Sequence, residues 1–358
     1  MLGLLMFFHK VPDTEGLKNY KIALRVLSVA YLCLGAANVL HVITGGQNIT
    51  EFSSLVFAGI YAIVSSLQAL LFTYSLITMI NTYYVTQKRV AVQLIPIVLL
   101  SVLVITGFIS KNLLFLQITV FVFAACYFIL LIYYTYIYAS EEKIVRTNIK
   151  DFFSDDESKR VEWVRIAFYS SLTIGFWALF IILFPHFEML EIIFSLVCLV
   201  FYPYIASRYM NYVNDFYVLQ PVIIQEKTEE NPPLVYSANG KAEFVPAMEK
   251  WISDKSFTKF GITINELAKQ LNSNRTYLSN YFKTQLNTNF NQWLNGLRIE
   301  EAKNLLANNP ELPLSEVAQQ LGYKELSAFS RNFSISTGVT PSAWKKNSLN
   351  NYELKAKN

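Results

Sequence analysis

The sequence predicts an all-α protein, in which a polytopic bundle of about six transmembrane helices is followed by a soluble domain with two helix-turn-helix motifs. Hydrophobic residues make up 53% of the 358 positions and charged residues only 16%, which is more apolar than a soluble domain. Apolar runs crowd the part before about Tyr212, whereas Lys, Glu, Asn and Gln dominate after it. We therefore expect a bundle with a sensing role over residues 1–218, a linker over 219–243, a soluble domain over 244–346 and a polar tail over 347–358.

Six apolar runs are long enough to cross a membrane, which takes about 20 residues at the rise of an α-helix. Charged or turn-forming residues bound each run. The runs cover Val26 to Ile43, Leu55 to Ile80, Val92 to Ile109, Leu113 to Tyr138, Val164 to Phe184, and Met189 to Tyr209. Because only the short turn from Ser110 to Asn112 separates the third run from the fourth, these two are expected to form an antiparallel hairpin.

Positive charges between the runs predict the orientation of the bundle. Lys and Arg gather before the first run and in the connections after the second and fourth runs. The first and fifth connections contain none, and the third contains only Lys111. Short loops rich in Lys and Arg stay in the cytoplasm, so both termini are expected there. The apolar start, Met1 to Phe8, is too short to span and precedes its positive charges, so no cleavable signal is predicted.

The connection from Ser140 to Glu162 is the longest one between the runs and mixes both signs of charge. Its acidic residues include Asp151, Asp155, Asp156 and Glu157. A cytoplasmic connection of this composition is usually solvated, and this is the favoured interpretation. The alternative is that the connection contacts the C-terminal domain.

Residues that carry chemistry are scarce in the apolar half. A transporter or channel keeps ionisable groups at mid-membrane depth, and these runs hold almost none. The three cysteines, Cys33, Cys126 and Cys198, lie singly in apolar runs and are predicted to be small core residues. The histidines are scattered, and neither a phosphate-binding glycine loop nor a nucleophile elbow occurs. We therefore predict no catalytic residue, cofactor or metal, and the chain is not expected to be an enzyme.

Two short helical patterns separated by a tight turn begin near Thr263. Thr263 and Glu266 have the spacing of a capping box, and the turn falls at Asn272 and Ser273. The second helix is expected to begin near Asn274. The inner apolar residues of the pair are Ile264, Leu267, Ala268, Leu271, Leu278 and Phe282. Helix, short turn and helix in this order predict a helix-turn-helix motif.

The same pattern recurs about fifty residues later, which is the spacing expected of an internal repeat. Gly322 supplies the permissive turn residue of this second copy. Its inner apolar residues are Leu314, Val317, Ala318, Leu321, Leu326, Phe329 and Phe333. Between the copies, apolar residues from Trp293 to Leu306 describe one longer helix that joins them.

Over roughly Val245 to Lys346 this arrangement resembles the AraC/XylS family of transcription regulators. The resemblance is carried by Leu278, Ser279, Phe282, Arg298, Ala302, Leu305, Ala318, Leu321, Gly322, Phe329, Arg331, Phe333, Gly338 and Pro341. It implies two recognition helices that enter successive major grooves on one face of double-stranded DNA. The chain departs from the family pattern at Asn280, Asn287, Ser334 and Ile335. Fewer basic residues predict weaker non-specific binding and a shallower salt dependence.

Residues exposed on these two helices are the candidate DNA contacts, because such side chains can reach phosphates and base edges. On the first helix they are Asn274, Arg275, Thr276, Ser279, Asn280 and Lys283. On the second helix they are Lys324, Glu325, Ser327, Ala328, Arg331 and Asn332. An ordinary polar helix face would show the same pattern, but the motif favours DNA contact for Arg275, Lys283 and Arg331.

Together these features predict a sequence-specific, membrane-bound transcription regulator in the inner membrane of a bacterium, which couples a membrane or envelope signal to gene expression. The expected partners are double-stranded DNA and the lipid bilayer. Formation of a homodimer and the identity of a signal ligand or membrane partner stay open. The alternative is a membrane transporter or channel with a regulatory helix-turn-helix tail, which the scarcity of mid-membrane charge disfavours.

Overall fold

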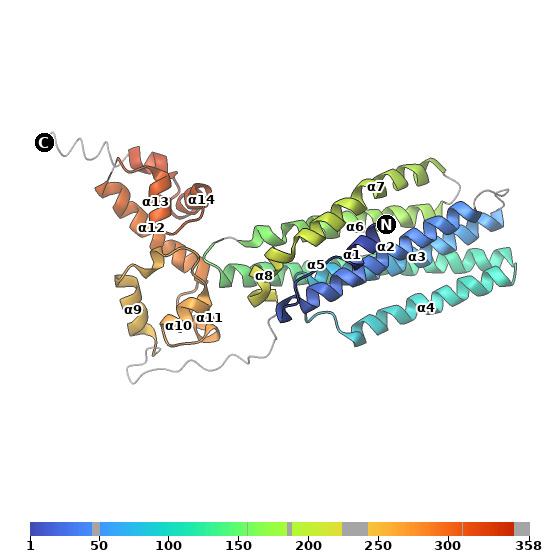
Figure 1. The fold of residues 1–358 in the computed structure, drawn as a ribbon, viewed down its shortest axis with the longest axis horizontal. Coiled ribbons are helices and arrows are strands. Elements are labelled where there is room, and N and C mark those ends of the chain that lie inside the picture. The colour runs from blue at the N-terminus through green and yellow to red at the C-terminus, as the bar shows by residue number, and fades with distance from the viewer. Residues whose placement is uncertain (45–50, 156, 185–187, 224–242, 310, 347–358) are drawn as a thin grey trace. The chain divides into compact units, whose positions relative to one another are not determined.

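The computed structural model describes residues 1–44, 51–155, 157–184, 188–223, 243–309 and 311–346. Every element in these ranges is a helix, which confirms the all-α part of the prediction (Figure 1). The first helices are α1 (Leu2–Phe7), α2 (Lys18–Thr44), α3 (Glu51–Thr78), α4 (Gln87–Ile109), α5 (Leu113–Phe152), α6 (Glu162–Leu183), α7 (Glu188–Asn211) and α8 (Val213–Ile223). The later ones are α9 (Val245–Ser253), α10 (Ile264–Gln270), α11 (Arg275–Thr284), α12 (Phe290–Asn308), α13 (Leu314–Gln320) and α14 (Leu326–Thr337). Short 3-10 turns are η1 (Glu15–Leu17), η2 (Glu157–Val161) and η3 (Ser256–Thr258).

Five of the described helices are long and apolar enough to cross a membrane. They are α3, α4, α5, the helical stretch over 157–183, and residues 192–211 of α7. These coincide with five of the six predicted runs. The remaining run, Val26 to Ile43, lies in α2, where the side chains from residue 37 onward are outside the described part of the chain. The predicted tail and most of the predicted linker are also outside it.

Hydroxyl groups join helices inside the bundle. The Tyr20 hydroxyl on α2 donates to the backbone oxygen of Tyr209 on α7 at 2.5 Å. Ser75 Oγ on α3 donates to the backbone oxygen of Ala23 at 2.9 Å and lies 2.8 Å from the Tyr209 hydroxyl. Such interhelical hydrogen bonds satisfy polar groups that would otherwise be stranded in an apolar interior.

The cysteines only partly follow the prediction. Cys33 and Cys198 are half-buried, whereas Cys126 is exposed on α5, so its prediction as a small core residue is wrong. A helix that is apolar on all sides gives no periodic signal to separate its inner face from its outer face.

The chain divides into two compact units, and the division falls inside α5. One unit comprises Met1–Val145 and Arg160–Gln225, and the other comprises Arg146–Lys159 and Glu226–Asn358. The part of the chain over residues 146–159, called here the 146–159 segment, therefore clusters with the C-terminal helices although it lies between two apolar helices in the sequence.

The start of the expected loop after the fourth apolar run is helical, because α5 continues to Phe152. Val145, Ile149 and Phe152 are buried. Their spacing of four and three residues places them on one face of the helix. This face supports the extension of α5 beyond its apolar part.

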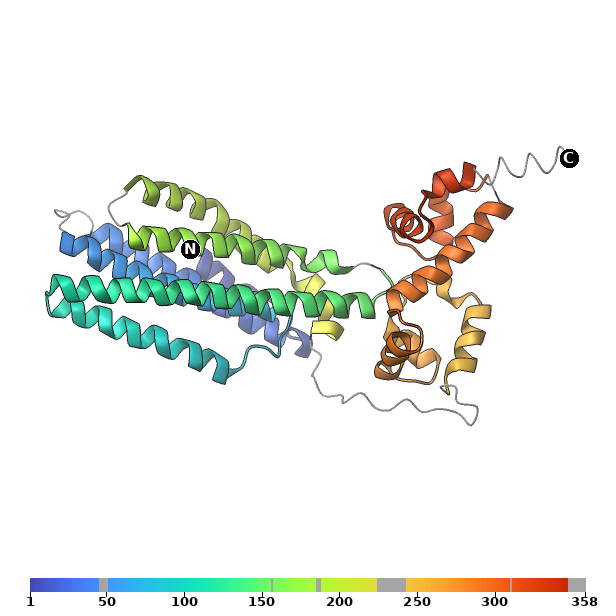
Figure 2. The ribbon, with the colours of Figure 1, turned by 180° about the vertical axis from the view of Figure 1, so that it is seen from behind.

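In the C-terminal unit, α12 is the central helix. The pair α10 and α11 packs toward one end of it, and the pair α13 and α14 toward the other (Figure 2). The inner residues predicted for the first pair are all buried, and so are Val317, Ala318, Leu321, Phe329 and Phe333 in the second. Leu326 is 42% exposed, so its predicted place in the inner stripe is wrong. It is the first residue of α14, where the helix has only begun.

The turns of both motifs have a local chemical cause. Thr263 and Glu266 form the predicted capping box at the start of α10. Asn272 has φ +49° in the predicted turn, and Asn287, which departs from the family pattern, also has φ +49°. Asparagine tolerates this left-handed conformation better than most residues. Gly322 has φ +76°, and a Cβ there would lie 2.5 Å from the backbone oxygen of Thr258.

Candidate nucleic-acid interface

The first candidate recognition helix, α11, is held by its cap and its core face. The side-chain oxygen of Asn274 accepts the backbone N–H of Tyr277 at 2.9 Å, which satisfies a free donor in the first turn. Leu278 and Phe282 are fully buried on the inner face. The other candidate residues of α11 are half-buried or exposed: Arg275, Thr276, Ser279, Asn280 and Lys283.

The second candidate recognition helix, α14, begins after Glu325. The Ser327 hydroxyl donates to the Glu325 carboxylate at 2.9 Å. The exposed candidates here are Lys324, Glu325, Ser327 and Arg331. Ala328 packs against the core of this motif. The Asn332 amide is half-buried and donates to the side-chain oxygen of Asn295 on α12 at 3.0 Å.

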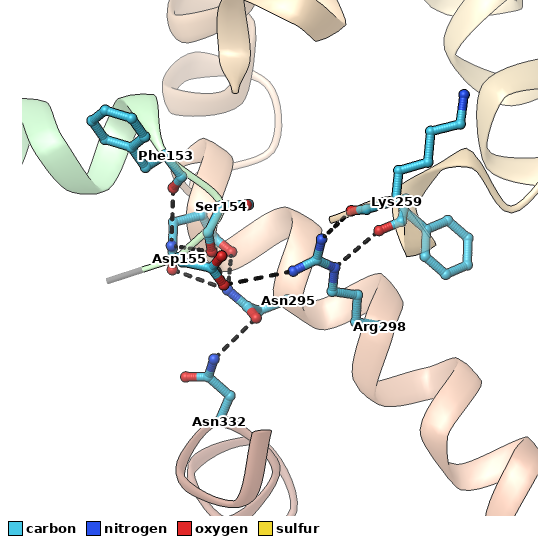
Figure 3. A network of polar contacts seen from close by, with 9 residues as sticks. Phe153, Ser154, Asp155, Lys259, Asn295, Arg298 and Asn332 are labelled. Atoms are coloured by element: carbon cyan, nitrogen blue, oxygen red, sulfur yellow. Dashed lines mark hydrogen bonds and ion pairs between the residues drawn. The ribbon is translucent and has the colours of Figure 1, made fainter. Parts of the chain in front are cut away.

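A buried cation lies at the centre of the unit. Arg298 on α12 is fully buried, and its guanidinium donates to the backbone oxygens of Phe257 at 2.9 Å and Lys259 at 2.8 Å (Figure 3). The ring of Tyr323 lies 5.2 Å from the guanidinium carbon. Burial lowers the pKa of the Arg298 guanidinium, and the nearby Tyr323 and Asp155 partly offset this lowering. Arg298 thus fastens the turn before α10 to the central helix.

The 146–159 segment packs against this centre through its backbone. Phe153 forms an antiparallel bridge with Thr263, and the Ser154 N–H donates to the backbone oxygen of Ile262 at 3.1 Å. The Asn291 amide on α12 donates to the backbone oxygens of Ser154 at 2.6 Å and Phe153 at 3.0 Å. Asn295 donates to the same Ser154 oxygen at 3.3 Å. The interpretation of this connection as solvated is therefore wrong, and the alternative, contact with the C-terminal domain, is confirmed.

Side chains of the segment meet two of the candidate DNA contacts. Asp151 Oδ2 lies 2.9 Å from Lys283 Nζ, and only 8% of the Asp151 side chain is exposed. The Arg275 guanidinium carbon lies 4.8 Å from the centre of the Phe152 ring. An aromatic face attracts a cation at this range. Both contacts fall on α11, the first candidate recognition helix.

Asp155 faces the second motif and the buried cation. One carboxylate oxygen lies 4.0 Å from Arg298 Nη1 (Figure 3). Burial raises the pKa of the Asp155 carboxyl; the positive charges of Arg298 and Lys324 oppose that rise, and the negative charge of Glu157 adds to it. The net upward shift shows that loss of water around Asp155 outweighs its attraction to the two cations.

Sequence reasoning named the helix-face residues but missed the roles of Asp151, Asn291 and Asn295. One available signal was the spacing of Val145, Ile149 and Phe152, which continues a helix past the apolar run. The four-residue step from Asn291 to Asn295 was another, since it places two amides on one face of α12. Neither signal identifies the partner.

Residues 267–347 match the helix-turn-helix domain family. This match agrees with the two helix-turn-helix pairs joined by α12. The C-terminal part is thus similar to AraC-type helix-turn-helix domains. The match begins within α10 and includes both candidate recognition helices.

Curated relatives of the helix-turn-helix domain are transcription regulators. The chain is 31% identical over 90 residues to the Msm operon regulatory protein of Streptococcus mutans, which covers 25% of this chain and 32% of that protein. It is 37% identical over 86 residues to the raffinose operon transcriptional regulatory protein of Pediococcus pentosaceus, covering 24% and 31%. It is 32% identical over 91 residues to the lactose operon transcription activator of Staphylococcus xylosus, covering 25% and 32%. The matched part thus spans about a third of these relatives. No solved structure matches the chain.

Proposed function

We propose that the chain is a membrane-bound transcription regulator, whose helix-turn-helix domain binds double-stranded DNA. The observation that carries this proposal is the pair of helix-turn-helix motifs joined by α12, in a domain whose relatives are transcription regulators. Five long apolar helices support insertion of the first unit in a bilayer. The distribution of Lys and Arg supports placement of both termini in the cytoplasm of a bacterium, where the domain would meet the chromosome.

The candidate contacts on α11 and α14 divide by chemistry. Arg275, Lys283, Lys324 and Arg331 carry the positive charges that suit phosphates, and arginine can also bind guanine edges with two hydrogen bonds. Thr276, Ser279, Asn280, Ser327 and Asn332 offer the hydroxyl and amide groups that suit base edges. Asn274 and Glu325 lie at the helix starts, and Ala328 is suited to an apolar contact at most.

The bundle is proposed to couple a membrane or envelope signal to the helix-turn-helix domain. Two chains held together in the membrane would raise the effective concentration of a second helix-turn-helix domain at paired DNA sites without any new base contact. Since the matched part covers only about a quarter of this chain, neither the signals nor the operators of these operon regulators are transferred to it.

Genome-wide mapping of DNA bound by the full-length protein in its native membrane tests this proposal. The test variant carries Arg275→Ala and Arg331→Ala, and the control carries Lys250→Ala, which removes one exposed lysine of α9 outside both recognition helices. Discrete peaks that persist in the control and disappear in the double variant are expected, with the protein retained in the membrane pellet after alkaline washing. Absence of peaks under every growth condition, or recovery of the protein in the soluble fraction, would contradict the proposal.

A further inference from the structure

Two acidic side chains of the 146–159 segment lie close to cations of the C-terminal unit. A carboxylate, like a phosphate, presents paired oxygens that accept hydrogen bonds from Lys and Arg. Asp151 forms an ion pair with Lys283 at 2.9 Å, and Asp155 lies 4.0 Å from Arg298. The positive charge of Lys324 also acts on the Asp155 carboxylate.

We propose that residues 151–155 of the same chain, held by Asn291 and Asn295 of α12, and the DNA backbone bind in turn to the surface formed by α11 and the start of α14. While the segment is docked, the helix-turn-helix domain has low affinity for DNA, and release of the segment exposes the surface. This inference rests on the proposed function and describes how its DNA site is regulated.

The overlap with the first recognition helix is direct. Arg275 and Lys283 lie eight residues apart on α11, which places them on one face of the helix. Phe152 covers Arg275, and Asp151 holds Lys283. Only 8% of the Asp151 side chain is exposed, whereas 54% of the Lys283 side chain is, so the pair is shielded on the Asp151 side and open to water on the Lys283 side. While the segment is docked, a phosphate has to compete with Asp151 for Lys283 and with Phe152 for Arg275.

The segment docks in a defined register rather than as a loose acidic chain. The bridge between Phe153 and Thr263 and the bond from Ser154 to Ile262 fix its backbone against the turn before α10. The Asn291 amide donates hydrogen bonds to two successive carbonyl oxygens of the segment, those of Phe153 and Ser154. These contacts are specific to backbone geometry, so they distinguish this occupant from a non-specific anion.

The docked segment also reaches the second motif. Asn295 donates to Ser154 and accepts from Asn332 on α14, which makes a relay from the segment to the second recognition helix (Figure 3). Arg298 Nη1 has no hydrogen-bond partner among the described residues, and Asp155 is the carboxylate nearest to it. One short stretch of chain therefore bears on both recognition helices at once.

The docked segment is continuous with an apolar helix. Residues 146–152 are the last turns of α5, a helix of 40 residues that is long and apolar enough to cross a membrane. A change in the position or tilt of α5 would pull on the docked stretch through the helix backbone. The arrangement offers a covalent route from a membrane event to the DNA site.

A reversible lock gives the sharpest test. Phe153→Cys and Thr263→Cys, in a full-length protein with Cys33, Cys126 and Cys198 changed to Ala, place two thiols at a bridge pair with the spacing a disulfide needs. The protein is purified in detergent, and its binding to a labelled DNA duplex of random sequence is measured by fluorescence anisotropy. The measurement is made first on the oxidised protein and then on the reduced protein. We expect the oxidised form to bind about tenfold or more weakly than the reduced form, because apparent affinity scales with the fraction of open surface.

A second variant releases the segment without a cross-link. Asp151→Asn with Asn291→Ala removes the ion pair to Lys283 and the grip on the backbone, while every candidate DNA contact stays in place. The control, Asp254→Asn, removes one exposed acid at the end of α9. The double variant should bind the duplex several-fold to about tenfold tighter than the control.

The outcomes separate the two proposals. Equal affinity of the oxidised and reduced forms, or failure of the thiols to join under mild oxidation, would overturn the docking proposal and leave DNA binding intact. No binding to the duplex by the reduced form and the releasing variant would overturn the proposed function itself.

Discussion

The two helix-turn-helix motifs of the C-terminal unit share a scaffold but differ in what lies against their second helices. On α11, Arg275 and Lys283 contact the 146–159 segment. On α14, Arg331 is exposed, and the segment reaches the helix through the relay from Asn295 to Asn332. An internal repeat therefore gives similar cores, while a segment from elsewhere in the chain makes the two surfaces unequal.

The largest expected effect is loss of the core of the second motif. Phe329 is fully buried against Phe333, Tyr323 and Leu321. Phe329→Ala should destabilise this motif by about 3–5 kcal/mol, because it removes buried apolar surface and leaves a cavity. Hydrogen exchange of the full-length protein should show faster exchange in α13 and α14 than in α10 and α11.

The matched control is Ile335→Ala on the same helix, whose side chain is 77% exposed. Its exchange should equal that of the unmodified protein within about 0.5 kcal/mol, the usual range for surface changes. If Phe329→Ala accelerated exchange equally in both motifs, the two cores would be one cooperative unit and the comparison between them would lose its basis.

The next effect concerns the turn of the second motif. Gly322→Ala should cost at least about 1–2 kcal/mol, since φ is +76° and the new Cβ would lie 2.5 Å from the Thr258 oxygen. Gly296→Ala is the control, because this glycine lies inside α12 and a Cβ there meets no atom within 4 Å. That change should stabilise the domain by about 0.5–1 kcal/mol. Urea unfolding, monitored by hydrogen exchange of the amides of α12 and α13, measures the change in stability of both variants. If Gly322→Ala and Gly296→Ala changed the stability in the same direction, the explanation of the turn would be refuted.

The surfaces should differ in their response to loss of charge. Arg331→Ala should weaken binding to a DNA duplex by about tenfold, as expected when one direct contact is lost. Lys283→Ala should weaken it less, because it removes one DNA contact but also frees Asp151 and loosens the docked segment. Anisotropy titrations at several salt concentrations measure both. A larger loss for Lys283→Ala than for Arg331→Ala would show that the segment does not compete at α11.

The sequence predicts the helical scaffold well because its signals are local. Thr263 and Glu266 define a cap three residues apart, and the inner stripes of both motifs recur at helical spacing. The docked segment depends instead on contacts between residues far apart in the chain, such as Asn291 with Phe153 across 138 positions. No periodicity encodes that pairing. The acids of the segment also have the composition of an ordinary solvated connection, which is why the favoured interpretation was wrong.

The same local limits explain the smaller differences. Leu326 fits the apolar spacing of α14 but stands at its first residue, where it is exposed. Asn287 departs from the family pattern, yet its φ of +49° gives the left-handed turn that a glycine would give. For the twelve candidate contacts, the sequence identifies the two helices that carry them. Which of the twelve bind DNA stays a prediction.

The smallest expected effect separates the two acids of the segment. Burial raises the pKa of Asp155, with Arg298 and Lys324 opposing and Glu157 adding to the shift, so its charged form is disfavoured where it sits. A raised pKa means that the docked form holds a proton more readily than the free segment does, so docking strengthens as the pH falls toward that pKa and weakens above it.

Asp155→Asn removes the disfavoured charge and should leave DNA affinity within about twofold of the unmodified protein, or lower it slightly through tighter docking. Asp151→Asn, which breaks the ion pair to Lys283, should raise affinity instead. Anisotropy titrations of both variants at about pH 6 and about pH 8 give the comparison. Both values lie well above about 4, where a free Asp side chain ionises. A rise in affinity for Asp155→Asn as large as that for Asp151→Asn would show that the attraction between Asp155 and Arg298, rather than the Asp151 pair, holds the segment in place.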